Sequence, residues 1–416
     1  MNYSENRRQF LKTAATGVTA FSMSAASYAR IVGANDRIAI GIIGCGSRGI
    51  GTHMMGINAH AAEQNIAITA VCDPWKVKQD EAANLCKDWY GLEARKFSHY
   101  RDLLALEDVD AVTIASCDHQ HPAHLKAAAE AGKDVYVEKP LGTHFQEVKD
   151  ACQAVRDNGV IVQVGTQLRS LPGMVGANEL FKTGILGSVS RIEQHRNGWR
   201  PYWYQYLKEV RQEDVDWNEF LMNQPPRPFD MNLYSGWYGY RGFSDGPVPG
   251  FGSHYIDLVH FITGAQFPVS SVCQGGTFTW KDDYGFTCPD HVEATWIYPE
   301  GFMATYSTNF GNGGGNAFKI YGQYGAFDLL NWDRPMLTGE GAGPDKMCVA
   351  EPKPIDQIPR PDHMLDWLQC IRSRNTPHAS IEAGYQHAVA VIMAMQAYDS
   401  GKRMIFDPQT HEIREG

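Results

Sequence analysis

A glycine-rich segment that begins at Gly44 has the residue spacing of a phosphate-binding loop. Residues 37–43 form an apolar run typical of a buried parallel strand, and Gly44, Gly46 and Gly49 follow it as Gly-x-Gly-x-x-Gly. The first glycine permits a tight turn, the second lets the backbone approach a pyrophosphate, and the third lets the next helix pack closely on the strand. Free N–H groups at the start of that helix attract phosphate. The segment therefore predicts a dinucleotide-binding site.

An acidic residue ends the next predicted strand. Residues 66–72 are mostly apolar and Asp73 follows them, where a carboxylate accepts hydrogen bonds from the ribose hydroxyls of adenosine. Its charge would repel the 2′-phosphate of NADP, so the pattern favours NAD, while Arg48 and Lys76 leave NADP open. We expect Ser47 and Arg48, inside the glycine loop, to contact the same cofactor. A turn residue before a proline is the alternative role for Asp73.

A charged pair closes a further predicted strand. Residues 110–115 and 134–137 are expected strands, and their alternation with helices predicts a parallel sheet with right-handed crossovers. Glu138 and Lys139 follow the second of these strands and precede a proline. Because ligands bind at the carboxyl edge of such sheets, we expect both side chains at the cofactor site.

Three histidines lie between these two strands. His119, His121 and His124 are closely spaced, but no fourth ligand lies nearby, and we therefore predict no metal site. We expect Ser116 and His121 to border the nicotinamide end of the cofactor site instead.

Longer blocks of sequence extend these signals along the chain. They are the glycine loop, Asp-His-Gln-His at 118–121, Ala-Gly-Lys-Asp-Val-Tyr-Val-Glu-Lys-Pro at 131–140, and shorter matches at 216–217, 252–257, 290–294 and 370–374. Together they resemble the Gfo/Idh/MocA family, named for glucose–fructose oxidoreductase, inositol dehydrogenase and a rhizopine-catabolism protein. Related enzymes of the same fold include NAD-dependent glycosidases.

The resemblance implies an α/β protein of two domains. The first, residues 35–164, is expected to be an NAD(P)-binding Rossmann domain with a doubly wound parallel sheet. The second, residues 165–416, is expected to be an α+β substrate domain with a large, mostly antiparallel open sheet. Alternating patterns, as in residues 292–298, agree with such a sheet. Because sheets of this kind often pair across subunits, we expect a homo-oligomer, either a dimer or a tetramer.

The resemblance also implies catalytic roles. In the family, the lysine of the Glu-Lys-Pro block lies beside the nicotinamide and the reacting hydroxyl, and this role falls on Lys139; a partly desolvated lysine can hold or share the hydroxyl proton. His254 matches the histidine that serves as general base in an Asp-x-x-x-His motif. The aspartate of that motif is replaced by Gly250. The missing carboxylate must come from elsewhere, and Asp245 and Asp257 are the candidates.

Two aromatic segments, residues 196–204 and 234–241, carry interleaved polar groups suited to the faces of a sugar. Packed loops of the second domain would have the same composition. The residues that we expect at the substrate are Gln167, Arg169, His195, Tyr202, Tyr204 and Tyr238.

The first 34 residues are predicted to be a bacterial twin-arginine signal peptide. Arg7 and Arg8 precede Phe-Leu-Lys, a weakly apolar stretch covers residues 13–26, and a small-x-small cleavage pattern follows at 27–29. An amphipathic N-terminal helix is the alternative. The signal predicts a periplasmic or secreted protein that folds before export, which agrees with free cysteines. The nine cysteines are odd in number and include no Cys-x-x-Cys pair.

The composition excludes several classes of partner. The formal net charge is -10 and no basic stripe occurs, which argues against nucleic-acid binding. No segment after the signal is long and apolar enough to predict a membrane span in the mature protein. The expected partner is a small sugar or glycoside.

Three functions agree with these features. The first is an NAD(P)-dependent oxidoreductase that transfers hydride between a tightly bound nicotinamide cofactor and a carbinol carbon of a sugar or glycoside. The second is a redox-neutral NAD-dependent glycoside hydrolase that oxidises, eliminates, hydrates and reduces, with His195, Tyr202 or Tyr204 as a further base. The third is a non-catalytic sugar-binding protein. Export favours a cofactor that stays bound and is regenerated in place, because the periplasm has no replenished NAD pool.

Overall fold

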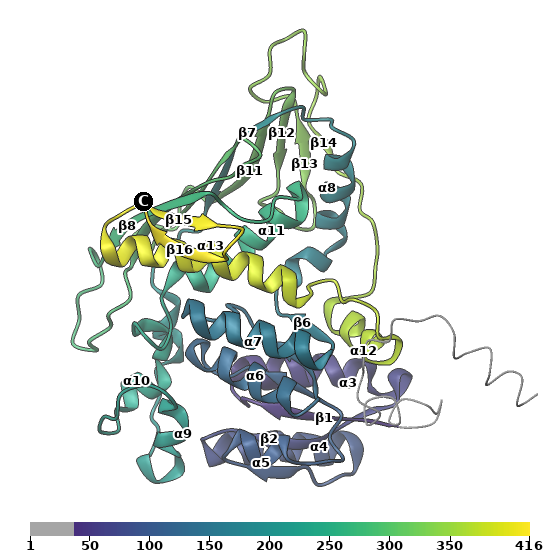
Figure 1. Cartoon of the computed structure of the whole chain (residues 1–416), viewed down its shortest axis with the longest axis vertical. Coiled ribbons are helices and arrows are strands. Elements are labelled where there is room, and N and C mark those ends of the chain that lie inside the picture. Colours follow the sequence, from purple (N-terminus) through teal and green to yellow (C-terminus); the bar gives the residue numbers. More distant parts are fainter. Residues whose placement is uncertain (1–36) are drawn as a thin grey trace, which may run out of the picture. The chain divides into compact units, whose positions relative to one another are not determined.

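The first of two sheets is six-stranded and entirely parallel. The structure, a computed structural model, describes residues 37–416 (Figure 1). The strand order is β3-β2-β1-β4-β5-β6, which is the Rossmann order. The strands are β1 (Ile38–Ile43), β2 (Ile66–Cys72), β3 (Arg95–Phe97), β4 (Ala111–Ile114), β5 (Asp134–Val137) and β6 (Val162–Val164). Their side chains are largely buried, as their apolar runs predicted.

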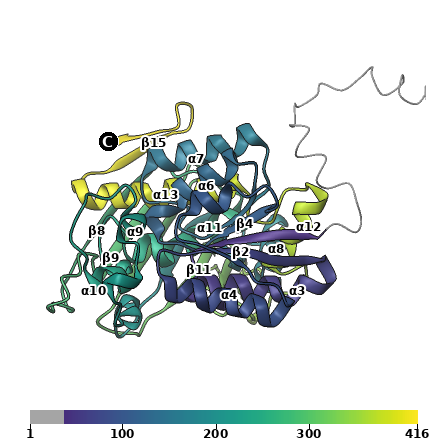
Figure 2. The ribbon, with the colours of Figure 1, turned by 90° about the horizontal axis from the view of Figure 1, so that it is seen from below.

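Helices cover both faces of this sheet, with α6 and α7 on one face and α3 and α4 on the other (Figure 2). The helices are α3 (Met55–Gln64), α4 (Lys76–Tyr90), α5 (Tyr100–Leu104), α6 (His121–Glu130) and α7 (Phe145–Asn158). A further helix, α12 (His363–Ser373), joins this layer from late in the chain. Its Trp367 and Leu368 are fully buried in one apolar cluster with Ile40 and Ile57.

The second sheet has ten strands in the order β14-β13-β12-β11-β7-β10-β9-β8-β15-β16. All neighbours are antiparallel except β7 and β10, which are parallel. The predicted combination of a Rossmann sheet and a large, mostly antiparallel sheet is therefore confirmed. The strands are β7 (Val189–His195), β8 (Ser270–Gly276), β9 (His291–Ile297), β10 (Met303–Asn309), β11 (Ala317–Gly322), β12 (Gly325–Asp328), β13 (Met336–Thr338), β14 (Lys353–Pro354), β15 (Met404–Asp407) and β16 (Glu412–Glu415).

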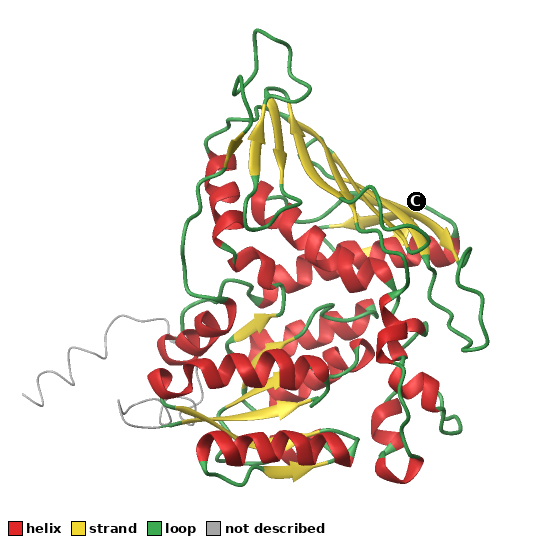
Figure 3. Cartoon of the chain, turned by 180° about the vertical axis from the view of Figure 1, so that it is seen from behind, coloured by secondary structure: helices red, strands yellow, loops and turns green. Residues whose placement is uncertain are grey.

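One face of the large sheet packs on helices α8 (Pro172–Lys182), α11 (Ser253–Thr263) and α13 (Ile381–Ser400) (Figures 1 and 3). The indole N–H of Trp296 on β9 donates to the Ala390 carbonyl of α13 at 2.7 Å. The other face leaves Val272, Ile297 and Met303 between 38% and 45% exposed. The helical layer lies between the two sheets and carries α11, whose first turn reaches the Rossmann sheet's carboxyl edge.

An excursion between β7 and α11 contains the short helices α9 (Trp217–Leu221) and α10 (Met231–Ser235), which lie beside the Rossmann layer (Figure 3). It is fixed to that layer by backbone contacts. Val215 forms an antiparallel bridge with Trp75, and the Asp216 N–H donates to the Pro74 carbonyl at 2.8 Å. The excursion therefore brings side chains of the second half of the chain over the end of β2.

The predicted signal segment, residues 1–34, lies outside the described residues. Among residues 37–416, no helix is both long enough and apolar enough to cross a membrane. The nine cysteines are all unpaired, and seven of them are buried.

Candidate active site

A cavity of about 430 Å³ opens at the carboxyl edge of the parallel sheet. The glycine loop after β1 and the end of β2 line one part of it, and the first turn of α11 lines another. Of the predicted site residues, ten line this single cavity: Gly44, Gly46, Ser47, Arg48, Asp73, Ser116, Lys139, Tyr202, Tyr238 and His254. The structure therefore brings together groups that are up to 210 positions apart in sequence.

The three loop glycines have separate geometric requirements. Gly44 has φ of +90°, and a β-carbon there would lie 2.6 Å from the backbone of Ala115. A β-carbon at Gly49 would lie 1.9 Å from the Gly44 carbonyl oxygen, so this glycine is needed for packing, and it does not line the cavity. A β-carbon at Gly46 would meet nothing within 4 Å. The space over Gly46 fits the close approach of a pyrophosphate.

Asp73 lies where β2 meets the cavity. Its carboxylate accepts hydrogen bonds from the backbone N–H groups of Cys45 at 2.7 Å and Trp75 at 2.8 Å. Burial raises the pKa of Asp73 to about 6, against the opposing effect of these two donors. The carboxylate is thus held rigidly beside the glycine loop, and its position fits an acceptor for the ribose hydroxyls of a dinucleotide.

The far end of β5 supplies Lys139. Its ammonium Nζ donates to the carbonyl oxygen of Gly250 at 3.0 Å, which ties the Glu-Lys-Pro block to the segment before α11. Burial lowers the pKa of Lys139, and the charges of Glu138 and Asp118 oppose this shift. A lysine in this environment exchanges a proton more readily than an exposed lysine.

Glu138 was predicted at the cofactor site, but its side chain lies behind the cavity wall. Its carboxylate contacts Arg48 Nε at 3.4 Å, His53 Nε2 at 3.1 Å and Gln167 Nε2 at 3.1 Å. Burial disfavours the charged form, but the Arg48 charge and the His53 contact outweigh it and hold the pKa of Glu138 below its usual range. Glu138 therefore orients Arg48 toward the cavity. Gln167, predicted at the substrate, is part of this support.

His254 lines the cavity from the first turn of α11. Burial, with help from the Lys139 charge, holds the pKa of His254 well below its ordinary value, so the ring is neutral. Its Nδ1 is buried and has no hydrogen-bond partner within the described chain. A neutral imidazole at a cavity wall has one donor and one acceptor nitrogen, which is suited to bind a hydroxyl.

A buried carboxylate that the sequence analysis did not assign lies close by. Asp118 is 2% exposed and accepts a hydrogen bond from Ser244 Oγ at 2.7 Å. Burial raises the pKa of Asp118 to about 7, while the positive charge of Lys139 opposes the increase. Asp118 belongs to the Asp-His-Gln-His block, but only the fold shows that it faces the Ser244 turn.

The neighbouring histidines do not converge on a common point. His119 Nε2 contacts the Phe220 carbonyl at 3.1 Å, His121 Nδ1 the Pro140 carbonyl at 2.7 Å, and His124 Nδ1 the Ser116 hydroxyl at 2.9 Å. His121 was predicted to border the cofactor, but its ring is buried behind the cavity wall, where it links two loops.

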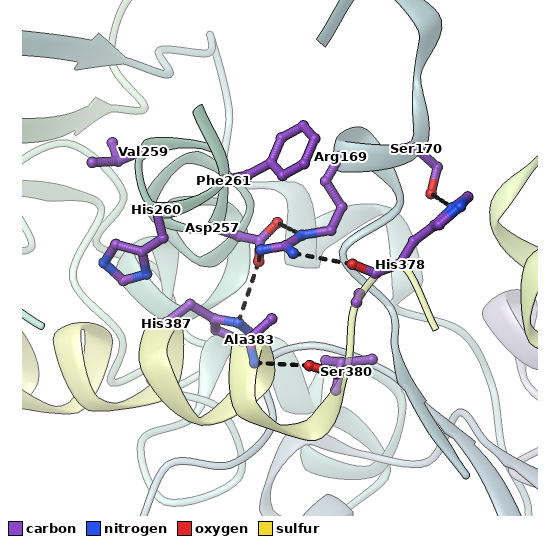
Figure 4. A network of polar contacts seen from close by, with 12 residues as sticks. Arg169, Ser170, Asp257, Val259, His260, Phe261, His378, Ser380, Ala383 and His387 are labelled. Atoms are coloured by element: carbon purple, nitrogen blue, oxygen red, sulfur yellow. Dashed lines mark hydrogen bonds and ion pairs between the residues drawn. The ribbon is translucent and has the colours of Figure 1, made fainter. Parts of the chain in front are cut away.

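Two predicted site residues pair with each other instead of lining the cavity. Arg169 donates through Nε and Nη2 to the two carboxylate oxygens of Asp257 at 2.9 and 2.7 Å (Figure 4). His387 of α13 lies 3.9 Å from the same carboxylate. The structure therefore places neither Asp257, predicted in the catalytic set, nor Arg169, predicted at the substrate, in the cavity wall, because the Asp257 carboxylate faces Arg169 and α13.

His195 and Tyr204 also lie outside the cavity wall. His195 is in β7, where its ring contacts Ser307 Oγ at 2.5 Å and Glu193 at 2.8 Å. The Tyr204 hydroxyl donates to Asp282, and its ring packs on Trp280. Asp245, a candidate for the missing carboxylate, forms an ion pair with Arg241 at 3.0 Å. The partners of all three side chains are residues of the second domain, so none of them faces the cavity.

The adenosine end of the cavity is covered from the second domain. Lys208 Nζ lies 4.7 Å from the centre of the Trp75 ring, on the opposite half of the chain, and both residues line the cavity. Phe220 and Tyr234 of α9 and α10 line the same end. The excursion that carries these residues is fixed by the bridge between Val215 and Trp75. It covers this end of the cavity, and we call this cover the roof.

Two family models match the chain. The oxidoreductase family, NAD-binding Rossmann fold, matches residues 38–166, and the oxidoreductase family, C-terminal alpha/beta domain, matches residues 178–405. The chain is 25% identical over 241 residues to the 2,7-anhydro-N-acetylneuraminate hydratase of Escherichia coli, covering 58% of this chain and 54% of that protein. It is 32% identical over 162 residues to an inositol 2-dehydrogenase/D-chiro-inositol 3-dehydrogenase of Shouchella clausii, covering 38% and 45%.

The matched region spans about half the length of these relatives. Among solved structures, the WlbA dehydrogenase of Bordetella pertussis in complex with NADH and UDP-GlcNAcA has a TM-score of 0.67 at 19% identity, over 89% of this chain and 99% of that one. That likeness concerns the fold. The Rossmann sheet with its glycine loop, the large second sheet and the two family matches lead to one conclusion: the chain belongs to the Gfo/Idh/MocA family of oxidoreductases.

Proposed function

We propose that the protein is an NAD-dependent oxidoreductase that transfers hydride between a tightly bound nicotinamide cofactor and a carbinol carbon of a sugar or glycoside. One observation carries the proposal. A single cavity joins the glycine loop and Asp73 to the side chains of Lys139 and His254. A dinucleotide that lies along Gly46 and Asp73 would have room to extend toward Lys139.

The residues that would hold the cofactor are Gly44, Gly46, Ser47, Arg48, Asp73 and Ser116. A bound nicotinamide would supply hydride-transfer chemistry. The open space over Gly46 accepts the pyrophosphate, and the fixed carboxylate of Asp73 accepts the ribose hydroxyls. The charge of Asp73 supports NAD over NADP.

Lys139 would receive the proton of the reacting hydroxyl. Its lowered pKa gives a larger neutral fraction, and neutral Nζ has a lone pair for that proton. The resulting ammonium is stabilised by the Gly250 carbonyl at 3.0 Å and by the negative charge of Asp118. His254, whose neutral ring lines the same cavity, binds and orients the hydroxyl.

A sugar is supported as substrate by the aromatic wall of the cavity. Tyr206, Trp237 and Tyr238 line it, and the rings of Trp237 and Tyr238 stack at 3.7 Å. Aromatic faces with nearby polar groups suit carbohydrate rings. The inositol dehydrogenase among the relatives acts on a polyol of similar chemistry.

A redox-neutral glycoside hydrolase is the second candidate. The roof over the adenosine end favours a cofactor that is not exchanged between turnovers, as such a cycle requires. A hydratase is also among the relatives. Of the three bases considered for this cycle, Tyr202 lines the cavity, whereas His195 and Tyr204 do not.

Export and assembly are further parts of the proposal. The arginine pair at 7–8, with the weakly apolar stretch after it, supports transport by the twin-arginine route to the periplasm or the medium. The exposed apolar side chains Val272, Ile297 and Met303 on the outer face of the large sheet support a homo-oligomer.

The two candidates are separated by one experiment on protein purified without added nucleotide. Nitrophenyl glycosides would be supplied in large excess over the enzyme. Sustained release of nitrophenol would establish the hydrolase. Absence of release, together with reoxidation of bound NADH by an added keto-sugar, would establish the oxidoreductase. If neither occurs, and bound nicotinamide does not respond to any sugar, both are wrong and a sugar-binding protein remains.

A further inference from the structure

The hydroxyl of Tyr202 occupies the space beside Gly250 where a larger residue would place its side chain. A β-carbon at position 250 would lie 2.3 Å from Tyr202 Oη and 3.2 Å from its Cζ. Contacts this short require one group to move, so the two positions exclude each other's side chains. Gly250 is also the residue whose carbonyl accepts the Lys139 hydrogen bond at 3.0 Å. The Tyr202 hydroxyl therefore lies next to the anchor of Lys139.

The tyrosine ring is held firmly in this position. It begins the turn η4 (Tyr202–Tyr206) and makes edge-to-face contacts with Trp203, Tyr238, Phe251 and Phe310, with ring centres 5.3 to 5.9 Å apart. Such contacts fix the ring plane without using the hydroxyl. The hydroxyl is thus presented to the cavity by a rigid aromatic support.

The hydroxyl itself is only weakly engaged. It donates to the Gly246 carbonyl at 3.4 Å, which is long for an O–H···O hydrogen bond. A phenol has one proton and two lone pairs to offer. Tyr202 lines the cavity together with Lys139 and His254, so its hydroxyl is free to turn to a ligand there.

We infer that Tyr202 is a third catalytic side chain, whose hydroxyl donates a hydrogen bond to the oxygen of the reacting carbinol while Lys139 takes the carbinol proton. The inference rests on the proposed function and adds to it the group that completes the site at Gly250. It also explains why position 250 is a glycine, because the side chain of an aspartate there would displace the Tyr202 hydroxyl.

The ionisation of the two groups agrees with this division of work. Burial raises the pKa of Tyr202 well above its ordinary value, so the phenol stays protonated and acts as a donor. Burial lowers the pKa of Lys139, so its amine acts as the acceptor. In oxidation the O–H bond gives its proton to Lys139 Nζ, and the carbon that bears this oxygen gives its hydride to the nicotinamide, which leaves a carbonyl. In reduction the Lys139 ammonium returns that proton, while the Tyr202 hydrogen bond polarises the carbonyl.

No carboxylate of the described residues lines the cavity beside Lys139 and Gly250. Asp118 is bound to Ser244, Asp245 to Arg241 and Asp257 to Arg169. Among the described residues that line the cavity, Asp73 is the one carboxylate, and it lies at the adenosine end. The hydroxyl oxygen of Tyr202 is accordingly the atom nearest to the place that a β-carbon at position 250 would take.

The first test compares Tyr202→Phe with Tyr204→Phe in the full chain. Both variants remove one hydroxyl from the same turn, but Tyr204 lies outside the cavity. The measured quantity is the single-turnover rate at which a sugar reduces the bound cofactor. Tyr202→Phe is expected to lower this rate by about 100-fold with the cofactor retained, as for loss of an acid–base group. Tyr204→Phe is expected to leave it within about three-fold. An unchanged rate in Tyr202→Phe would overturn the inference and leave the proposed function intact.

The second test measures thermal unfolding and does not depend on activity. Gly250→Ala is made in the natural protein and in the Tyr202→Phe variant. If the hydroxyl lies over position 250, the alanine lowers the melting temperature strongly beside tyrosine and much less beside phenylalanine. Equal losses in the two backgrounds would refute the juxtaposition. If instead the natural protein oxidises no sugar, the proposed function fails and the catalytic role of Tyr202 fails with it, whatever the melting temperatures show.

Discussion

Arg169 and Asp257 form a bidentate ion pair whose side chains are only 9% and 1% exposed. The pair joins the turn after β6 to α11, the helix that carries His254 in its first turn. His387 of α13 completes the group, since its Nδ1 lies 3.9 Å from the same carboxylate (Figure 4). The pair therefore fixes the helix that positions His254 and takes no part in the cavity.

We expect Asp257→Asn to act on stability and much less on turnover. Removing one charge leaves Arg169 buried and uncompensated, which should reduce the free energy of unfolding by about 3 kcal/mol. Denaturant unfolding measures this change, and turnover per folded molecule should fall by less than about ten-fold. The double variant Arg169→Met/Asp257→Asn should recover part of the stability. Unchanged stability with turnover lost would return Asp257 to the catalytic set.

The pH dependence of turnover should follow Lys139. Its folded-state pKa is lowered by burial, so the neutral amine becomes populated at a lower pH than in an exposed lysine. The rate of sugar oxidation should therefore rise with pH, and the rate of keto-sugar reduction should fall over the same range. Lys139→Met should remove this pH dependence and slow both sugar oxidation and keto-sugar reduction by about 100-fold or more. Lys126→Met, on an exposed position of α6, is the control, and the same loss there would contradict the assignment.

Gly46 and Gly49 should differ when each is replaced by alanine. The β-carbon at 46 enters open space, so the cofactor-free protein should keep its melting temperature but lose its affinity for NAD. The β-carbon at 49 meets the Gly44 carbonyl, so the free energy of unfolding of the cofactor-free Gly49→Ala variant should fall by about 3 kcal/mol. Calorimetry of both variants, stripped of nucleotide, separates the two effects. Normal NAD binding by Gly46→Ala would place the pyrophosphate elsewhere.

Lys208 should slow the release of the cofactor. It lies over the Trp75 ring at the roofed adenosine end, and truncation removes both this contact and a positive charge. Lys208→Ala should release bound NAD about five-fold faster, which corresponds to roughly 1 kcal/mol. Stopped-flow measurement of release, with Lys87→Ala on exposed α4 as the control, tests this. Equal release rates would show that the roof does not retain the cofactor.

Export should depend on the arginine pair. Replacing Arg7 and Arg8 by lysine should leave the protein in the cytosol with its cofactor bound, because transport and folding are separate steps. Cell fractionation reports the outcome. Unimpaired export of the lysine variant would argue against the twin-arginine route.

The Rossmann half was predictable because its signals are local. The glycine loop follows an apolar strand, and Asp73 and Lys139 each follow another, so the topology of a parallel sheet brings them to one edge. The second sheet was predictable in kind, from alternation and from the resemblance, but not in strand order. Pairings such as β7 with both β10 and β11 join segments more than 100 residues apart.

The misplaced residues share a physical cause. A polar residue in a turn or on a helix face can point to a cavity or to a buried partner, and sequence spacing does not decide between the two. Asp257 follows His254 by less than one helical turn and still faces Arg169, whose position depends on the fold around β6. Lys208 and Asp118 were missed for the converse reason, since only the excursion and the Ser244 turn bring them to the site.

The most direct test of the central claim is the absorbance of bound nicotinamide in protein purified without added nucleotide. On addition of a panel of sugars and glycosides, at least one compound should produce the reduced-nicotinamide band, with no more than one equivalent per chain, and Lys139→Met should abolish the response. A protein that carries no nicotinamide and binds none when NAD is supplied would contradict the account.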